Sequence, residues 1–89
     1  MPKYRVVFHR KAEKSFDGLD KKTKRMVLED ILCLTEFSEL KSRLDIVKME
    51  GMKDFYRLRS GRLRVMFTLD KPSGTIIILK IEQREKAHE

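Results

Sequence analysis

The order of hydrophobic periodicities along the chain is the feature that most constrains its fold. Residues 10–36 repeat apolar side chains every three or four positions, which is typical of helices. Residues 45–84 instead carry runs of β-branched and aromatic residues between glycine-containing turns, which is typical of strands. A chain with its helices grouped before most of its strands forms an α+β domain. We therefore predict two N-terminal helices packed on one face of a small antiparallel sheet.

The individual elements are predicted from the same patterns. A strand is expected at Tyr4–Phe8, a short helix ends at Gly18, and Asp20 caps a second helix that runs to about Glu36. The apolar stripe of this second helix consists of Val27, Leu28, Ile31, Leu32 and Leu34. Four strand-like segments follow, at Asp45–Glu50, Asp54–Arg59, Arg62–Leu69 and Thr75–Arg84. The order is β-α-α-β-β-β, with one extra short strand if Asp45–Glu50 joins the sheet.

Length and charge narrow the classes of protein. At 89 residues the chain is predicted to be a single domain, residues 1–89. Its 21 Lys and Arg against 14 Asp and Glu give a formal charge of +7, which indicates an anionic partner: nucleic acid, an anionic membrane surface or an acidic protein. The sequence contains neither an apolar run of membrane-spanning length nor the apolar run of a signal peptide, so we expect a cytoplasmic protein. The lone Cys33 excludes an internal disulfide and cannot by itself hold zinc, and we expect no metal and no cofactor.

The segment "DFYRLRSGRLRVMF" carries four arginines between Arg57 and Arg64 with no acid among them. Because side chains alternate along a strand, these arginines are expected on one face of the sheet. The predicted helix-facing side chains include Leu58, Val65, Phe67, Ile77, Leu79 and Ile81. The predicted cationic side chains on the other face are Arg57, Arg59, Arg64, Lys80 and Arg84.

Two interpretations fit this cationic face. Arginine makes planar, bidentate contacts with phosphate, and like charges across a sheet repel each other, so the cluster indicates a surface that grips a phosphodiester backbone. The alternative is a solvated face whose arginines pair with carboxylates from neighbouring strands. The candidate carboxylates are Glu50, Asp54, Glu82 and Glu85.

The segments "KMEGMKDFYRLRSGRLRVMF" and "IIILKIEQRE", together with the element order, resemble the RelE/ParE superfamily of toxins from toxin–antitoxin operons. The resemblance covers nearly the whole chain and favours the RelE-type branch. For that branch it implies cleavage of mRNA in the ribosomal A site, by attack of a ribose 2′-OH on the adjacent phosphate. It also implies catalytic roles for Arg57, Arg59, Arg64 and Arg84, and further RNA contacts from Lys48, Lys53, Arg62, Lys80 and Lys86.

Arginine stays protonated far above neutral pH, so another group must accept the 2′-proton. The candidates are His88 and Glu50, with Glu82, Tyr56 and a group on the ribosome as further alternatives. The sequence departs from the family at two points. Glu50 precedes Gly51 where relatives often have a basic or apolar residue, and the C-terminal tyrosine common in RelE-type toxins would fall just beyond Glu89.

The resemblance further implies that the toxin is held inactive by an acidic, RelB-like antitoxin, that its targets are the ribosome and mRNA, and that it needs no small-molecule ligand. A ParE-type toxin, which inhibits DNA gyrase without cutting RNA, is the alternative that shares this fold. A catalytically degenerate homologue that still binds RNA is the second alternative.

Overall fold

The computed structural model describes residues 4–36 and 45–83, so predictions on residues 1–3, 37–44 and 84–89 lie outside the described part. Its elements are β1 (Arg5–Phe8), α1 (Arg10–Asp17), α2 (Lys21–Cys33), the 3₁₀ helix η1 (Leu34–Glu36), β2 (Asp45–Lys48), β3 (Phe55–Ser60), β4 (Leu63–Asp70) and β5 (Thr75–Gln83). The α+β class and the predicted order are confirmed, and β2 is the extra short strand.

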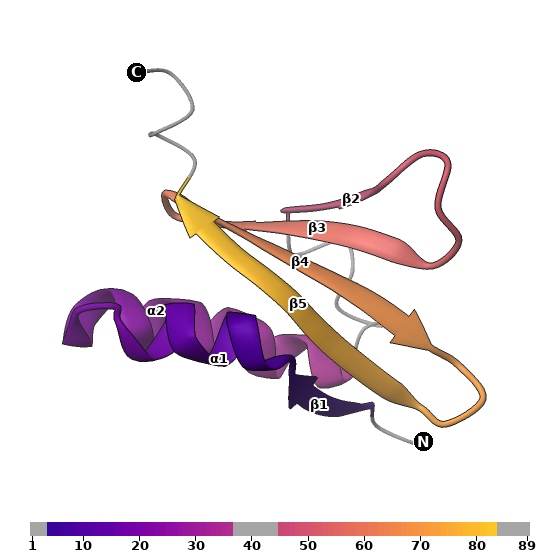
Figure 1. Ribbon diagram of the computed structural model, residues 1–89, viewed down its shortest axis with the longest axis horizontal. Coiled ribbons are helices and arrows are strands. Elements are labelled where there is room, and N and C mark those ends of the chain that lie inside the picture. The colour runs from indigo at the N-terminus through magenta and orange to yellow at the C-terminus, as the bar shows by residue number, and fades with distance from the viewer. Residues whose placement is uncertain (1–3, 37–44, 84–89) are drawn as a thin grey trace.

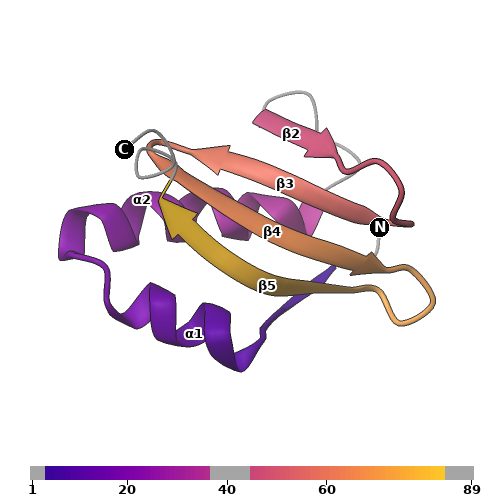
Figure 2. The ribbon, with the colours of Figure 1, turned by 45° about the horizontal axis from the view of Figure 1, so that its top comes forward.

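The five strands form one sheet in the order β1-β5-β4-β3-β2. Strands β2 to β5 are antiparallel neighbours, as predicted. The pairing of β1 with β5 is parallel, which makes the sheet mixed and corrects the antiparallel prediction at this one edge. A parallel pair requires a long crossover connection, and here the two helices and three strands between β1 and β5 supply it. Both helices lie on the same side of the sheet (Figure 1). Figure 2 shows α1 along the β5 side, and α2 contacts β3.

Both helices begin at a side-chain cap. His9 Nδ1 accepts a hydrogen bond from the backbone N–H of Lys11 at 3.2 Å, at the start of α1. Asp20 Oδ2 accepts one from the backbone N–H of Thr23 at 3.4 Å, at the start of α2. These acceptors satisfy N–H groups that have no partner within the helix. The hydrogen bonds from Thr23 lower the pKa of Asp20.

The core lies between the helix layer and the inner face of the sheet. Its fully buried side chains include Ala12, Val27, Ile31, Leu34, Leu58, Val65, Phe67, Ile76 and Ile78. The predicted apolar stripe of α2 is too wide, because Leu28 and Leu32 are 37% and 54% exposed. With 3.6 residues per turn, these two leucines lie about 100° and 140° around the helix from Val27, outside the arc that faces the sheet.

A β-bulge changes which side chains of β5 face the helices. Met66 of β4 pairs with Lys80, whereas Phe67 pairs with Ile78, so Leu79 has no partner in the register. The extra residue shifts the alternation by one position. Ile76, Ile78 and Ile81 are therefore buried, and the prediction that Ile77 and Leu79 face the helices is wrong. Beyond the bulge the predicted facing is correct, with Lys80 on the opposite side from Ile81.

The turn between β3 and β4 is a two-residue connection, because Ser60 pairs with Leu63. Gly61 in this turn has φ of +59°, a conformation that favours glycine. A Cβ at this position would also lie 2.7 Å from Met26 Cε of α2. The turn therefore lies directly against the helix layer, with Arg59 and Arg64 on the strands just before and after it.

Candidate nucleic-acid interface

The side of the sheet that faces away from the helices carries the predicted arginines. We call this side the arginine face and define it by Arg57, Arg59, Arg64 and Lys80. Arg57 and Arg59 alternate with the buried Tyr56 and Leu58 of β3, which places both guanidinium groups opposite the core. The structure therefore brings three of the four predicted catalytic arginines to one face.

Strand register arranges this face in rows. The first row contains Asp45, Arg59, Arg64 and Glu82. The second row contains Val47, Arg57, Met66 and Lys80. The third row contains Phe55, Thr68, Ile77 and Val7. Rows that are two residues apart along a strand are separated by about 7 Å. The first two rows hold the cations, and the third is largely apolar.

Two carboxylates moderate the charge of the first row. Asp45 lies 3.6 Å from Arg59, and Glu82 lies 3.7 Å from Arg64 and 3.4 Å from Lys80. Strong charge-assisted hydrogen bonds are about 2.7–2.9 Å long, so these are loose contacts. Every one of these side chains is at least 28% exposed, and such surface pairs contribute about 0–1 kcal/mol. Part of the solvated-face interpretation is therefore correct, but the pairs are weak enough for a phosphate to replace them.

Arg57 is different from its neighbours. Its Nε is buried and has no hydrogen-bond partner within residues 4–36 and 45–83, and no described carboxylate lies within ion-pair distance of its guanidinium. A buried donor without a partner costs about 1–3 kcal/mol. Arg57 is therefore a partly buried cation at the centre of the face, and no described carboxylate neutralises it.

The other predicted RNA-binding and catalytic positions fall in different places. Lys80 lies on the arginine face beside Met66, and Arg62 is exposed in the β3–β4 turn. Lys48 pairs with Tyr56, so alternation places it on the side opposite the arginines. Arg84, Lys86 and His88 lie outside the described residues, so their roles stay predictions.

Glu50 and Lys53 lie in the loop between β2 and β3. Together with Lys48, Met49, Gly51 and Met52 they line an open hollow of about 700 Å³. This loop adjoins Phe55, whereas Arg59 and Arg64 lie at the other end of β3 and β4. Glu50 is therefore next to the third row and remote from the first.

The third row was not recognised from the sequence. Its apolar character depends on Ile77, which the bulge turns outward, and on Val7, which parallel pairing with β5 brings alongside. Val7 is 44% exposed. Strand alternation alone places Phe55 on the same face as Arg57, so Phe55 was the residue from which the sequence could have indicated an apolar row.

The described residues contain no group of three or more His, Cys, Asp or Glu side chains that could hold a metal ion. Within that same part of the chain, no helix has both the length and the apolar character needed to cross a membrane.

The chain is similar to proteins of a known toxin family. A sequence model of the family described as "ParE toxin of type II toxin-antitoxin system, parDE" matches residues 6–88. A protein of Methanocaldococcus jannaschii named "Putative toxin RelE1" is 30% identical over 86 residues, which cover 97% of this chain and 96% of the relative.

Solved structures show the same fold. The archaeal RelE–RelB complex from Pyrococcus horikoshii OT3 contains a chain with a TM-score of 0.79 and 32% identity, with 92% of this chain and 96% of that chain covered. The isolated E. coli RelE toxin has a TM-score of 0.77 at 15% identity, with 90% and 83% covered. The similarity thus spans the strands that carry the arginine face.

Proposed function

Because this chain belongs to the ParE/RelE toxin family, we propose that it stops translation by cutting mRNA on the ribosome. It is the toxin of a RelBE-type toxin–antitoxin system. The finer proposal is an endoribonuclease of the RelE type, acting in the cytoplasm.

The observation that carries the proposal is Arg57, with its buried and unpartnered Nε, between Arg59 and Lys80 on one open face. Cations fixed before the reaction stabilise the charge that develops on a phosphate in the transition state. Losing one such group typically reduces the rate by about 10²–10³-fold. No described carboxylate neutralises Arg57, so its charge is available to stabilise a phosphate.

The proposed reaction is a transphosphorylation. The 2′-oxygen forms a bond to the adjacent phosphorus and gives its proton to a base, while the bond between phosphorus and the 5′-oxygen breaks. The 5′-oxygen takes up a proton, so the products are a 2′,3′-cyclic phosphate and a 5′-hydroxyl. The arginines supply charge stabilisation and hold the nucleotide in line for attack.

We propose His88, rather than Glu50, as the proton-transfer group. Gln83 pairs with Leu63, next to Arg64, so the described chain ends beside the first row. His88 is five residues further along the chain, a span of at most about 18 Å. Glu50 lies in the loop at the opposite end of the sheet. A His88→Gln variant is expected to lose about 10²–10⁴-fold in cleavage rate, whereas Glu50→Gln should retain it.

The proposed protein partner is a RelB-like antitoxin, as the P. horikoshii complex suggests. A formal charge of +7 and an open cationic face favour an acidic segment that covers the arginines and blocks RNA.

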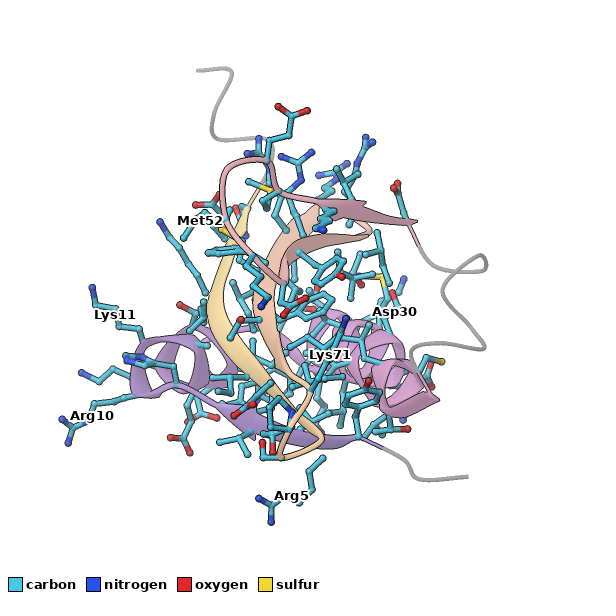
Figure 3. The ribbon with its side chains drawn as sticks, turned by 90° about the vertical axis from the view of Figure 1, so that its right-hand side faces the viewer. Arg5, Arg10, Lys11, Asp30, Met52 and Lys71 are labelled. Carbon is cyan, nitrogen blue, oxygen red and sulfur yellow. The ribbon has the colours of Figure 1, made fainter. Side chains whose placement is uncertain are left out.

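The test is cleavage of a translated message by the purified toxin with ribosomes, read out by mapping transcript ends. The wild-type chain should cut within codons in the A site, and Arg57→Ala or Arg64→Ala should abolish the cuts. Arg10→Ala is the matched control, because Arg10 projects from α1 into solvent, away from the arginine face (Figure 3). Equal cleavage by wild type and Arg57→Ala would contradict the proposed site.

A ParE-type activity is the second candidate, because the matching family model carries the ParE description. A gyrase inhibitor would alter DNA supercoiling without cutting RNA, and Arg57→Ala would leave that effect unchanged. A degenerate homologue would bind RNA through the arginine face without producing either cuts or supercoiling defects.

A further inference from the structure

Phe55 occupies an unusual position among the aromatic residues of the described chain. Phe8 contacts Phe16 with ring centroids 5.5 Å apart, and Tyr56 stacks on Phe67 at the same distance. Both pairs belong to the core or pack against it. Phe55 instead lies on the arginine face, is only partly buried, and has no ring contact with another described residue.

The surroundings of Phe55 combine an apolar surface with nearby cations, which suits the binding of a nucleotide. Thr68 lies directly opposite Phe55 on β4, and Met66 and Val47 occupy diagonal positions in the second row. Met66 and Val47 are uncharged, whereas Asp70, the other diagonal neighbour on β4, carries a carboxylate. Arg57 and Lys80 lie one row away, about 7 Å along the strands. An apolar ring therefore adjoins a cationic strip, which is the combination that single-stranded nucleic acid binds.

We propose that Phe55 is a stacking platform for one base of the bound RNA, with a neighbouring phosphate at Arg57. This inference rests on the proposed function and adds to it a residue that recognises a base rather than the backbone. Because every base has a π-face, the platform increases affinity with little sequence preference. It also fixes which phosphate reaches the first row.

An apolar side chain of the antitoxin is the competing occupant of the third row. The adjacent cations favour RNA, because a nucleotide supplies both an apolar face and an anion within one short unit.

The test compares two oligoribonucleotides of equal length and charge, one intact and one with its central nucleotides abasic. Binding to the purified full-length toxin is measured at fixed salt. The wild-type chain should bind the intact oligonucleotide about five- to 140-fold more tightly than the abasic one. Phe55→Ala should lose most of this difference, and Phe55→Tyr, which keeps the ring, should restore it. Leu32→Ala removes an exposed apolar side chain from α2 and should leave the difference unchanged.

Each outcome has a defined meaning. If Phe55→Ala keeps the full difference between the two oligonucleotides, the platform is wrong, and weakened antitoxin binding in the same variant would assign the third row to the antitoxin. Arg57→Ala tests the underlying function separately, because it should weaken the binding of the intact and the abasic oligonucleotide by the same factor. If Arg57→Ala weakens the binding of neither oligonucleotide, the arginine face does not bind phosphate, and this conclusion is independent of the result for Phe55.

Discussion

Ser60 Oγ donates a 2.6 Å hydrogen bond to Asp30 Oδ2, joining the end of β3 to the C-terminal half of α2. Ser60 is 1% exposed, on the helix side of the sheet. Figure 3 shows Asp30 on the helix that lies beneath the strands. This hydrogen bond between two side chains links the helix layer to the sheet. It anchors the strand that carries Arg59, one residue before Ser60.

The first prediction concerns this hydrogen bond. Ser60→Ala leaves the Asp30 carboxylate without its donor in a partly buried site, so the free energy of unfolding should fall by about 1–3 kcal/mol. Denaturant unfolding measures the change. Ser15→Ala, on the exposed side of α1, is the control and should change stability by less than about 0.5 kcal/mol.

The same pair permits a double-mutant cycle. Ser60→Ala and Asp30→Ala combined should cost clearly less than the sum of the two single variants, because both remove the same contact. Additive losses would show that the two residues stabilise the protein independently.

The second prediction concerns the stability of Arg57 variants. Arg57→Met keeps the aliphatic stem and removes a buried Nε that has no described partner. Because no hydrogen bond is lost and an unsatisfied donor disappears, unfolding free energy should stay within about 0.5 kcal/mol of wild type or rise. Cleavage should nevertheless be lost. A large loss of stability would show that Arg57 supports the fold rather than a ligand.

Much of the arginine face could be predicted from the sequence, because strand alternation is a local property. The sequence pattern correctly predicted which residues of β3 face the core, because Tyr56 and Leu58 are buried as expected. The residues of β5 that face the core could not all be predicted in the same way. The bulge depends on pairing with β4, and the unbroken apolar run of "TIIILKIEQ" does not indicate it. The parallel pairing of β1 with β5 could not be predicted either, since it depends on where the chain between these two strands places β5 in the sheet. The tie between Asp30 and Ser60 joins residues 30 positions apart, and only the assembled layers reveal it.

The third prediction concerns Glu82, whose carboxylate lies within 4 Å of both Arg64 and Lys80. Glu82→Gln removes the negative charge from the first row and frees both cations for phosphate. RNA affinity should rise several-fold at low salt, and the gain should shrink as salt increases. Filter binding across a salt series measures it. Glu29→Gln, an equal charge change on the exposed side of α2, should have a much smaller effect.

The fourth prediction concerns pH. The Thr23 hydrogen bonds lower the pKa of Asp20, so the unfolded chain binds a proton at this residue more readily than the folded chain. The stability that this charge contributes is therefore present above the ordinary carboxylate range near pH 4, and it is lost as pH falls through the lowered pKa. Asp20→Asn keeps an acceptor oxygen for the cap without titrating. The stability difference between wild type and Asp20→Asn should thus be more favourable to wild type at pH 7 than at pH 3. An equal difference at both pH values would contradict the assignment.

The fifth prediction uses the bulge in β5 as a matched pair of deletions. Removing Leu79 or removing Lys80 each deletes one residue between Ile78 and Ile81, and each restores a regular alternation that keeps both isoleucines buried. Both variants should therefore fold, which circular dichroism and thermal unfolding can establish. They differ in the residue placed opposite Met66: the first deletion keeps a cation there, and the second replaces it with leucine. Deleting Lys80 should weaken RNA binding and reduce the slope of log affinity against log salt by about 0.7, the value for one phosphate on a single strand. Deleting Leu79 should leave that slope unchanged, and equal slopes in the two variants would exclude Lys80 from phosphate contact.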